Sequence, residues 1–144
     1  MLFRSEASYR ASLERDPEDL DTTAHYGLCL ARMGRLPEAR PLLERVVGGN
    51  PDHDYGATLM TLAEICQAHG EPEKAIGLWR RVLENHSYAR ARVQLAELLA
   101  ASGESAAARQ LAEELINDDA HAPGFRRGKD GEWVRRAKAL VARL

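Results

Sequence analysis

The amino-acid sequence repeats itself with a period of about 34 residues, and this repetition constrains the fold more than any other feature. Three consecutive stretches, residues 20–53, 56–89 and 89–122, share one pattern. In each stretch a large apolar residue precedes a small one, and a glycine and then an alanine follow at the same offsets. The matching residues are Tyr26, Gly27, Gly34 and Ala39 in the first stretch, Leu62, Ala63, Gly70 and Ala75 in the second, and Leu95, Ala96, Gly103 and Ala108 in the third. Such a period predicts a stack of similar units, each burying its apolar face against the next.

The residues of the pattern predict that each unit is a pair of helices. Glycine ends the first helix, because it adopts a left-handed backbone without a side-chain penalty. Pro37 and Pro72 stand near the start of the second helix, where a missing N–H costs little. The alanine is small enough for the paired helices to cross closely. The sequence is also rich in alanine, leucine, arginine and glutamate, which favour helices. We therefore predict an all-α fold.

This pattern resembles that of the tetratricopeptide repeat family, and three consecutive matches make the resemblance specific. The third stretch departs from the family pattern at Ala112, where a bulky residue is usual, and at Ala120, where proline is usual. The resemblance implies an α-solenoid in which antiparallel helix pairs form a right-handed superhelix. It also implies a scaffold for protein–protein interaction and not an enzyme.

The segments outside the three repeats are predicted to close the two ends of the stack. Residues 1–19, with Tyr9 at a matching offset, have the pattern of a second helix without a first one. They predict an N-terminal half-repeat or cap helix, and we expect the chain to be a fragment of a longer repeat protein. Residues 123–144 begin with a glycine-rich basic linker and continue into a predicted capping helix from about Glu132 to Leu144.

In the family that the chain resembles, the first helices of successive repeats line a concave groove. Carried over by position, the groove has an apolar thread of Leu28, Met60 and Val93 between polar flanks. Apolar anchors with polar neighbours suit an extended peptide or a partner's helix. The groove residues implied by the resemblance are Asp21, His25, Leu28, Arg32, Met60, Glu64, Gln67, Arg90, Val93, Gln94 and Glu97. The alternative interpretation is that these side chains only pack against one another between repeats.

Positive charge is concentrated at the C-terminal end. Residues 121–144 carry seven basic and two acidic side chains, whereas the whole chain has a net charge of −2. The candidate basic surface consists of Arg126, Arg127, Lys129, Arg135, Arg136 and Lys138. One interpretation is contact with an anionic membrane surface. The interpretation that we favour is pairing with carboxylates at the end of the third repeat, namely Glu113, Glu114, Asp118 and Asp119. Nucleic acid is not expected as a partner, because aromatic residues are few and the rest of the chain is acidic.

The sequence contains no catalytic motif such as a glycine-rich phosphate loop, HExxH or GxSxG. We therefore predict no enzymatic activity and no cofactor. Cysteine and histidine recur as His25 with Cys29 and as Cys66 with His69. The repeat register separates the two histidines by on the order of 12 Å along the helix axis, so one zinc ion cannot bind all four side chains. No metal site is predicted.

The predicted function is that of a non-catalytic scaffold that binds a peptide or helix of a protein partner in the groove. One alternative is a soluble module of a longer, membrane-anchored assembly or regulatory protein whose basic C-terminal segment contacts anionic surfaces. Another is homodimerisation through the open half-repeat, with Leu2, Phe3 and Tyr9 at the contact. Two cysteines without a disulfide pattern predict a cytoplasmic or otherwise reducing compartment. No apolar run approaches the roughly 20 residues that span a bilayer.

Overall fold

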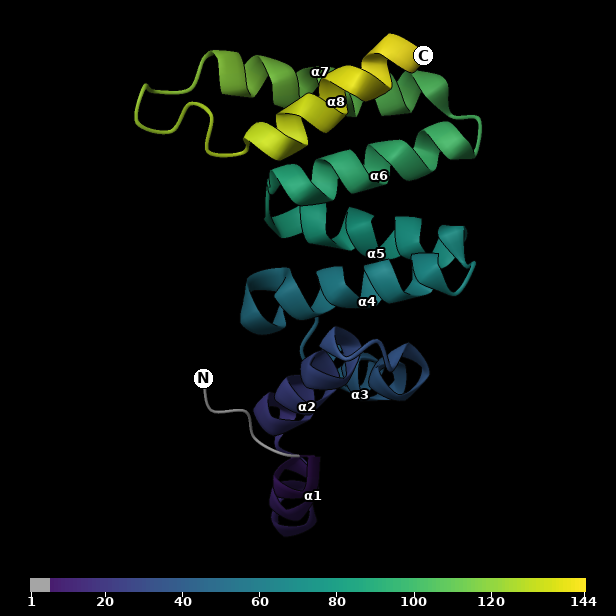
Figure 1. The fold of residues 1–144 in the computed structure, drawn as a ribbon, viewed down its shortest axis with the longest axis vertical. Helices are drawn as coiled ribbons and strands as arrows, with labels where there is room; N and C mark the ends of the chain where they lie inside the picture. The colour runs from purple at the N-terminus through teal and green to yellow at the C-terminus, as the bar shows by residue number, and fades with distance from the viewer. Residues whose placement is uncertain (1–5) are drawn as a thin grey trace. The chain divides into compact units, whose positions relative to one another are not determined.

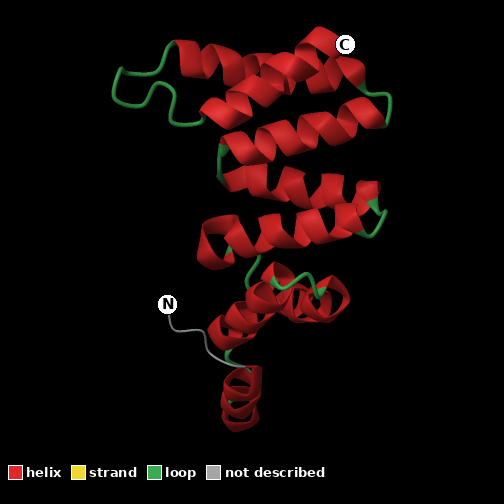
Figure 2. Cartoon of the chain, viewed as in Figure 1, coloured by secondary structure: helices red, strands yellow, loops and turns green. Residues whose placement is uncertain are grey.

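The computed structural model describes residues 6–144, and helices account for all of their regular secondary structure (Figures 1 and 2). The α-helices are α1 (Glu6–Arg15), α2 (Leu20–Arg32), α3 (Leu36–Gly49), α4 (Ala57–Ala68), α5 (Pro72–Asn85), α6 (Ala89–Ala101), α7 (Ser105–Ala120) and α8 (Gly131–Arg143). A short 3-10 helix, η1 (His53–Gly56), precedes α4. The prediction of an all-α fold is confirmed. None of the helices described is both long and apolar enough to cross a membrane. The chain forms two compact units, Met1–Glu71 and Pro72–Leu144.

Three helices end in the same left-handed turn. Gly34, Gly70 and Gly103 follow α2, α4 and α6, with φ angles of +79°, +75° and +88°. In each turn, the amide that follows the glycine donates a 2.9 Å hydrogen bond to a carbonyl near the helix end: Arg35 to Leu30, Glu71 to Cys66 and Glu104 to Leu99. These bonds satisfy carbonyls that a helix end leaves unpaired, and glycine adopts the required φ without steric cost. The predicted role of the three glycines is confirmed.

In the unit Met1–Glu71, α2 and α3 cross closely because small residues stand at the crossing. Ala39 of α3 is fully buried. A Cβ atom added to Gly27 of α2 would lie only 2.8 Å from Cδ2 of Leu43, whose side chain is also fully buried. The close approach of the two helices therefore requires glycine at position 27.

The two residues that separate the first repeat from the second have an unusual backbone. Asp54 and Tyr55 both have a φ angle of +54°, in the left-handed region that disfavours side chains. The preceding residue, His53, anchors this turn at both ring nitrogens. Its Nε2 lies 2.7 Å from Oδ1 of Asp21, and its Nδ1 lies 2.8 Å from Oγ1 of Thr58. The insertion thus forms a sharp turn that allows α4 to pack against α2.

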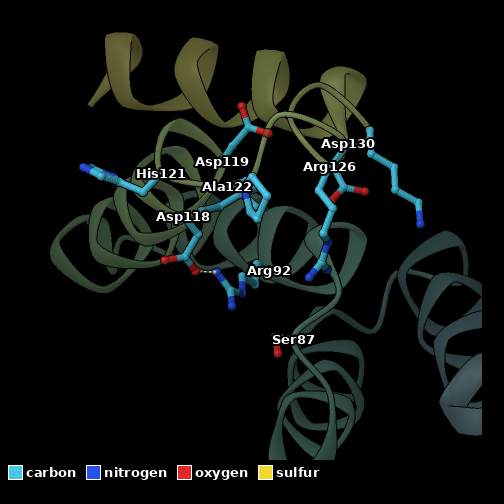
Figure 3. A pocket seen from close by; sticks show the side chains of 11 residues that line it. Ser87, Arg92, Asp118, Asp119, His121, Ala122, Arg126 and Asp130 are labelled. Atoms are coloured by element: carbon cyan, nitrogen blue, oxygen red, sulfur yellow. Dashed lines mark hydrogen bonds and ion pairs between the residues drawn. The ribbon is translucent and has the colours of Figure 1, made fainter.

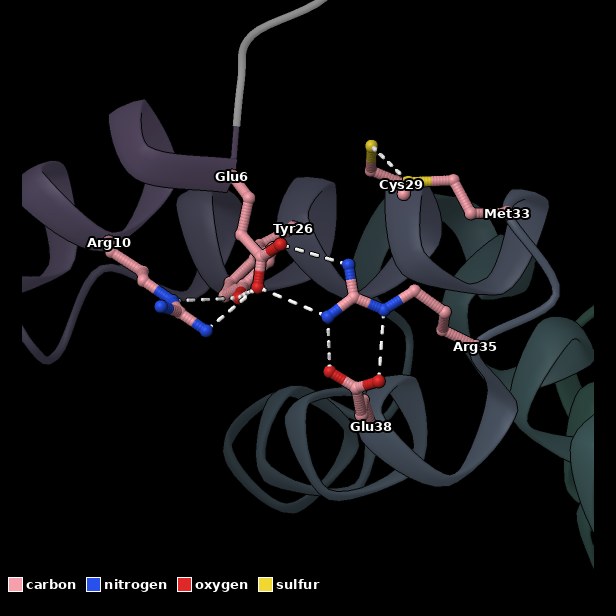
Figure 4. A network of polar contacts seen from close by, with 7 residues as sticks. All are labelled: Glu6, Arg10, Tyr26, Cys29, Met33, Arg35 and Glu38. Atoms are coloured by element: carbon pink, nitrogen blue, oxygen red, sulfur yellow. Dashed lines mark hydrogen bonds and ion pairs between the residues drawn. The ribbon is translucent and has the colours of Figure 1, made fainter.

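The first helix, α1, has no buried residue and is held against its unit by polar and aromatic contacts (Figure 4). The ring of Tyr9 stacks on that of Tyr26, with centroids 5.5 Å apart. The carboxylate of Glu6 accepts a 2.7 Å hydrogen bond from the Tyr26 hydroxyl, and it pairs with Arg10 at 2.8 Å and with Arg35 at 2.9 Å. Hydrogen bonds from Arg35 and Tyr26 lower the pKa of Glu6 to about 2.

In the unit Pro72–Leu144, helix α8 packs against both α7 and α6. Its buried residues are Val134, Ala137 and Leu140. Trp133 is half-buried, and the Arg136 guanidinium lies over its ring at 4.7 Å from the centroid. The contacts of α8 cover apolar side chains of the last repeat, which is the function of a terminal cap in repeat arrays.

Candidate functional site

Helix α2 leaves part of the predicted groove surface accessible. Asp21, His25 and Arg32 are exposed, and Leu28 is half-buried. His25 and Arg32 stand three and four residues from Leu28, so both are its neighbours on the helix surface. Asp21 is already engaged by His53, at the 2.7 Å distance given above. An apolar side chain between two accessible nitrogen-bearing side chains is therefore present on α2.

Helix α4 lies against α2 and presents less of the predicted surface. Gln67 is exposed and Glu64 is half-buried. Met60, however, is only 7% exposed, so it is part of the packed interior. For this residue the structure agrees with the alternative interpretation, in which the side chain packs within the protein.

Helix α6, in the unit Pro72–Leu144, likewise buries its predicted apolar groove residue and leaves the polar ones partly exposed. Val93 is fully buried, whereas Arg90, Gln94 and Glu97 are half-buried. Burial lowers the pKa of the Arg90 guanidinium. Glu97 accepts a hydrogen bond from Nε of Arg136 on α8, with Nε and Oε2 3.2 Å apart. Register alone could not reveal that Val93 points into the interior or that α8 supplies a partner for Glu97.

The six cations of the candidate basic surface have different environments. Arg136 is held by Glu97 and covers Trp133. The other five are exposed, and none of them forms an ion pair with a carboxylate among residues 6–144; they are Arg126, Arg127, Lys129, Arg135 and Lys138. Five of the six predicted residues thus remain available to a partner.

The carboxylates at the end of α7 have partners other than these cations. Asp118 pairs with Arg92 of α6 at 2.7 Å. Asp119 accepts a hydrogen bond from the backbone N–H of Gly128 at 3.4 Å. Within the described chain, no carboxylate of α7 pairs with a cation of the candidate basic surface. Glu113 and Glu114 contact Arg109 and Gln110 of α7 itself. The interpretation that these carboxylates neutralise the basic surface is therefore wrong, because all four have partners on α6, on α7 or in the loop backbone.

A cavity of about 460 Å³ lies beside these carboxylates in the same unit (Figure 3). It is bordered by the connection from α5 to α6, by α6, by the end of α7 and by the loop that follows α7. Its polar lining includes Ser87, Arg92, Asp118, Asp119, Arg126 and Lys129. The sequence identified the cations of the loop, but the loop's path, which creates the cavity, was not predictable from them.

Neither cysteine takes part in a metal cluster. No group of three or more histidine, cysteine, aspartate or glutamate side chains able to hold a metal ion occurs in residues 6–144. Neither cysteine forms a disulfide within residues 6–144; Cys29 is half-buried and Cys66 is buried.

Sequence comparison identifies the repeat. Two tetratricopeptide repeat profiles match the chain, one over residues 19–85 and the other over residues 61–123. Together they span the three predicted repeats. The comparison with curated proteins gave no match.

Comparison with solved structures gives the same fold. The crystal structure of MamA aligns with a TM-score of 0.70 at 20% identity, over 95% of this chain and 82% of that one. The type III secretion translocator chaperone SycD of Yersinia enterocolitica aligns with a TM-score of 0.70 at 18% identity, over 91% of this chain and 93% of SycD. YrrB, a tetratricopeptide repeat (TPR) protein, aligns with a TM-score of 0.72 at 20% identity, over 94% of this chain and 72% of YrrB. The fold is thus an α-solenoid of antiparallel helix pairs, and the chain belongs to the tetratricopeptide repeat family.

Proposed function

We propose that the chain is a non-catalytic scaffold that binds a peptide or a helix of a protein partner along its first helices. Tetratricopeptide repeat proteins bind protein or peptide partners, and YrrB is described as having an unusual peptide-binding site. The observation that carries the proposal is the accessible Leu28 between His25 and Arg32 on α2. Covering a partly exposed leucine with a partner lowers the free energy of the complex. The neighbouring His25 and Arg32 can form hydrogen bonds with the partner's backbone or carboxylates.

The proposed contact residues follow from exposure. Gln67 of α4 extends the surface on the unit that contains α2. Met60 and Val93 support the helices from inside and are not proposed to touch the partner.

Leu28→Glu provides the test. Partners captured by chemical crosslinking with the wild-type chain would be identified, and the purified partner segment would be titrated calorimetrically. Loss of an apolar anchor should weaken binding by about tenfold or more. Leu13→Glu is the matched control, because Leu13 is also half-buried but lies on α1, outside the proposed surface. After circular dichroism shows that both variants are folded, equal affinities for the partner would refute the proposal.

The exposed Phe125 favours a second candidate function, contact with an anionic membrane surface. Its side chain is 87% exposed and adjoins Arg126 and Arg127, which have no carboxylate partner in residues 6–144. The chain would then serve as a module of a longer, membrane-anchored assembly or regulatory protein. Sedimentation with phosphatidylserine vesicles tests this candidate: binding should fall steeply with salt and with Phe125→Ser. Vesicle binding that is unaffected by salt and by Phe125→Ser would exclude membrane contact.

Homodimerisation through α1 is a third candidate, favoured by the absence of buried residues on this helix. Leu2 and Phe3 lie outside the described residues, and Tyr9 is stacked on Tyr26, so changing Tyr9 would also disturb the monomer. Ala7→Glu and Ala11→Glu are cleaner tests, because both alanines are exposed. Light scattering should detect a dimer in the wild type and a monomer in each of the two variants. A monomeric wild type would contradict this candidate.

We propose a cytoplasmic or otherwise reducing compartment as the place of action, because neither Cys29 nor Cys66 forms a disulfide within residues 6–144.

A further inference from the structure

Tyr26 of α2 is contacted by three residues from one face of α1. Its ring stacks on that of Tyr9, with centroids 5.5 Å apart. Its hydroxyl donates a 2.7 Å hydrogen bond to Oε1 of Glu6 and accepts a 3.2 Å hydrogen bond from Nε of Arg10 (Figure 4). Tyr26 itself is only 8% exposed, so α2 presents a well-packed residue to a carboxylate, an aromatic ring and a guanidinium of another helix.

Arg35, the N-cap residue of α3, is a second anchor for the same carboxylate. Its Nη1 lies 2.9 Å from Oε2 of Glu6, and its Nε donates a 2.9 Å hydrogen bond to Oε1 of Glu38, which holds the guanidinium in place. Arg35 and Glu38 balance each other's charge, as do Glu6 and Arg10, which pair at 2.8 Å. Recognition at this surface therefore depends on the order of charges along the helix that lies on it, and not on that helix's net charge. We call the surface formed by Tyr26, Arg35 and Glu38 the α1-binding surface.

Helix α1 lies on this surface without being packed into the unit Met1–Glu71. None of its 10 residues is buried, and Leu13, on the same face as Glu6 and Tyr9, is half-buried. Isolated helices shorter than about 12–15 residues are marginally stable in water, and segments with few buried apolar contacts open at low free energy. Detachment of α1 therefore breaks the polar and stacking contacts described above but exposes little apolar surface.

We propose that the α1-binding surface is a docking site for a helix of a protein partner, and that α1 occupies this site when the partner is absent. The partner helix would carry a carboxylate and then, three, four and seven residues later, an aromatic ring, a guanidinium and an apolar side chain. These are the spacings of Glu6, Tyr9, Arg10 and Leu13 in α1, and they place four anchors on one side of a helix. Because α1 belongs to the same chain, it competes with the partner as an intramolecular ligand. The α1-binding surface does not include Leu28, so this inference is independent of the proposed function.

The first experiment asks whether the surface accepts a helix from another molecule. The probe is a fluorescent peptide with the sequence of residues 6–16, in which a hydrocarbon staple replaces the exposed Ala7 and Ala11 and keeps the peptide helical. Fluorescence anisotropy measures its binding to the 144-residue chain and to the Glu6→Gln variant, after circular dichroism shows that both are folded.

Glu6→Gln removes charge-assisted hydrogen bonds that hold α1 in place, so the variant should bind the peptide about tenfold more tightly than the wild type. Glu14→Gln is the control, because Glu14 is an exposed residue of α1, and it should bind the peptide like the wild type. Equal affinities of the wild type and Glu6→Gln for the peptide, or no binding to either, would overturn the proposal.

The second experiment tests which groups recognise the helix. Arg35→Gln, added to Glu6→Gln, should weaken peptide binding by about tenfold, because it removes an anchor of the peptide's carboxylate. The matched control is Arg81→Gln added to Glu6→Gln, since Arg81 is an exposed arginine of α5 in the other compact unit. Equal weakening by the two added substitutions would overturn the role of Arg35.

A peptide with Glu6→Arg and Arg10→Glu has the same composition and net charge as the probe but the opposite order of charges. It should bind the Glu6→Gln variant at least about tenfold more weakly than the probe does. Equal binding of the two peptides would overturn recognition by the order of charges.

Light scattering distinguishes a partner's helix from the α1 helix of a second copy of the chain. A wild-type dimer that Glu6→Gln dissociates would show that α1 of a second copy occupies the surface, and would overturn the partner helix as occupant. A wild-type monomer, or a dimer that Glu6→Gln leaves intact, supports the partner helix when the peptide binds as expected.

Discussion

Glu6 and Arg35 are 29 residues apart in the sequence, yet Nη1 of Arg35 lies 2.9 Å from Oε2 of Glu6 (Figure 4). This pair joins α1 to the turn between α2 and α3. The same carboxylate accepts hydrogen bonds from the Tyr26 hydroxyl and from Arg10. Because α1 has no buried residue, this network and the stacked rings of Tyr9 and Tyr26 carry its attachment.

The lowered pKa of Glu6 predicts that the attachment of α1 is sensitive to acid. The pKa is about 2 in the folded chain, compared with an ordinary value of 4.5. A carboxylate with a lowered pKa stabilises the folded state fully above its unfolded pKa and loses that contribution as pH falls through the folded value. We therefore expect the amide chemical shifts of α1 to move toward those of a detached helix between pH 4.5 and 2.

Glu6→Gln should cause the same change at neutral pH, because the amide cannot replace the charge that attracts Arg35. Glu14→Gln is the control, since Glu14 is an exposed residue of the same helix. Wild-type shifts in the Glu6→Gln variant at neutral pH would show that the network does not hold α1.

Two helical glycines should respond to alanine with opposite changes in stability. A Cβ added to Gly77 of α5 meets nothing within 4 Å, so Gly77→Ala should stabilise the fold by about 0.5–1 kcal/mol. A Cβ added to Gly27 would lie 2.8 Å from the fully buried Leu43, so Gly27→Ala should destabilise it by about 1–3 kcal/mol. Urea denaturation measures both changes. Stabilisation at position 27 would mean that α2 and α3 do not cross as closely as described.

The left-handed turn before α4 should be relieved by glycine. Tyr55 has a φ of +54°, and a left-handed conformation costs a residue with a side chain roughly 1–2 kcal/mol. We expect Tyr55→Gly to stabilise the fold by about 1 kcal/mol in thermal denaturation. Tyr88→Gly is the control, because Tyr88 is also an exposed tyrosine but has a φ of −59°, and it should lower the melting temperature. Destabilisation by both changes to a similar extent would argue against strain at position 55.

Arg136 is expected to need its planar guanidinium as well as its charge. It pairs with Glu97 through two nitrogens and covers the ring of Trp133. Lysine lacks the planar guanidinium that can donate two parallel hydrogen bonds to a carboxylate. Arg136→Lys should therefore lower the free energy of unfolding nearly as much as Arg136→Gln, by on the order of 0.5–1 kcal/mol for this partly exposed pair. Chemical denaturation should show no such loss for Arg135→Lys, because Arg135 is exposed and has no ion pair among residues 6–144. A lysine variant as stable as the wild type would show that charge alone suffices at position 136.

The sequence by itself determined the repeated helix pairs and the turns between them. Gly34, Gly70 and Gly103 recur at fixed offsets, and each turn is closed by a hydrogen bond that spans only five residues. Interactions of such short range depend on neighbouring residues alone, so periodicity was sufficient to predict them. The position of the two inserted residues, Asp54 and Tyr55, was also evident from the repeat spacing. The turn that they adopt was not, because it is anchored by His53, which contacts both Asp21 and Thr58.

Tertiary structure decided which side chains remain for a partner. Register gave Leu28, Met60 and Val93 equivalent roles, yet only Leu28 keeps appreciable exposure, because burial depends on every helix that packs nearby. The charges of the C-terminal segment show the same dependence. Sequence proximity suggested partners at the end of α7, but Asp118 pairs instead with Arg92, 26 residues away. Ion pairs form between groups that are close in space, and the packing of α7 against α6 brings Asp118 to Arg92.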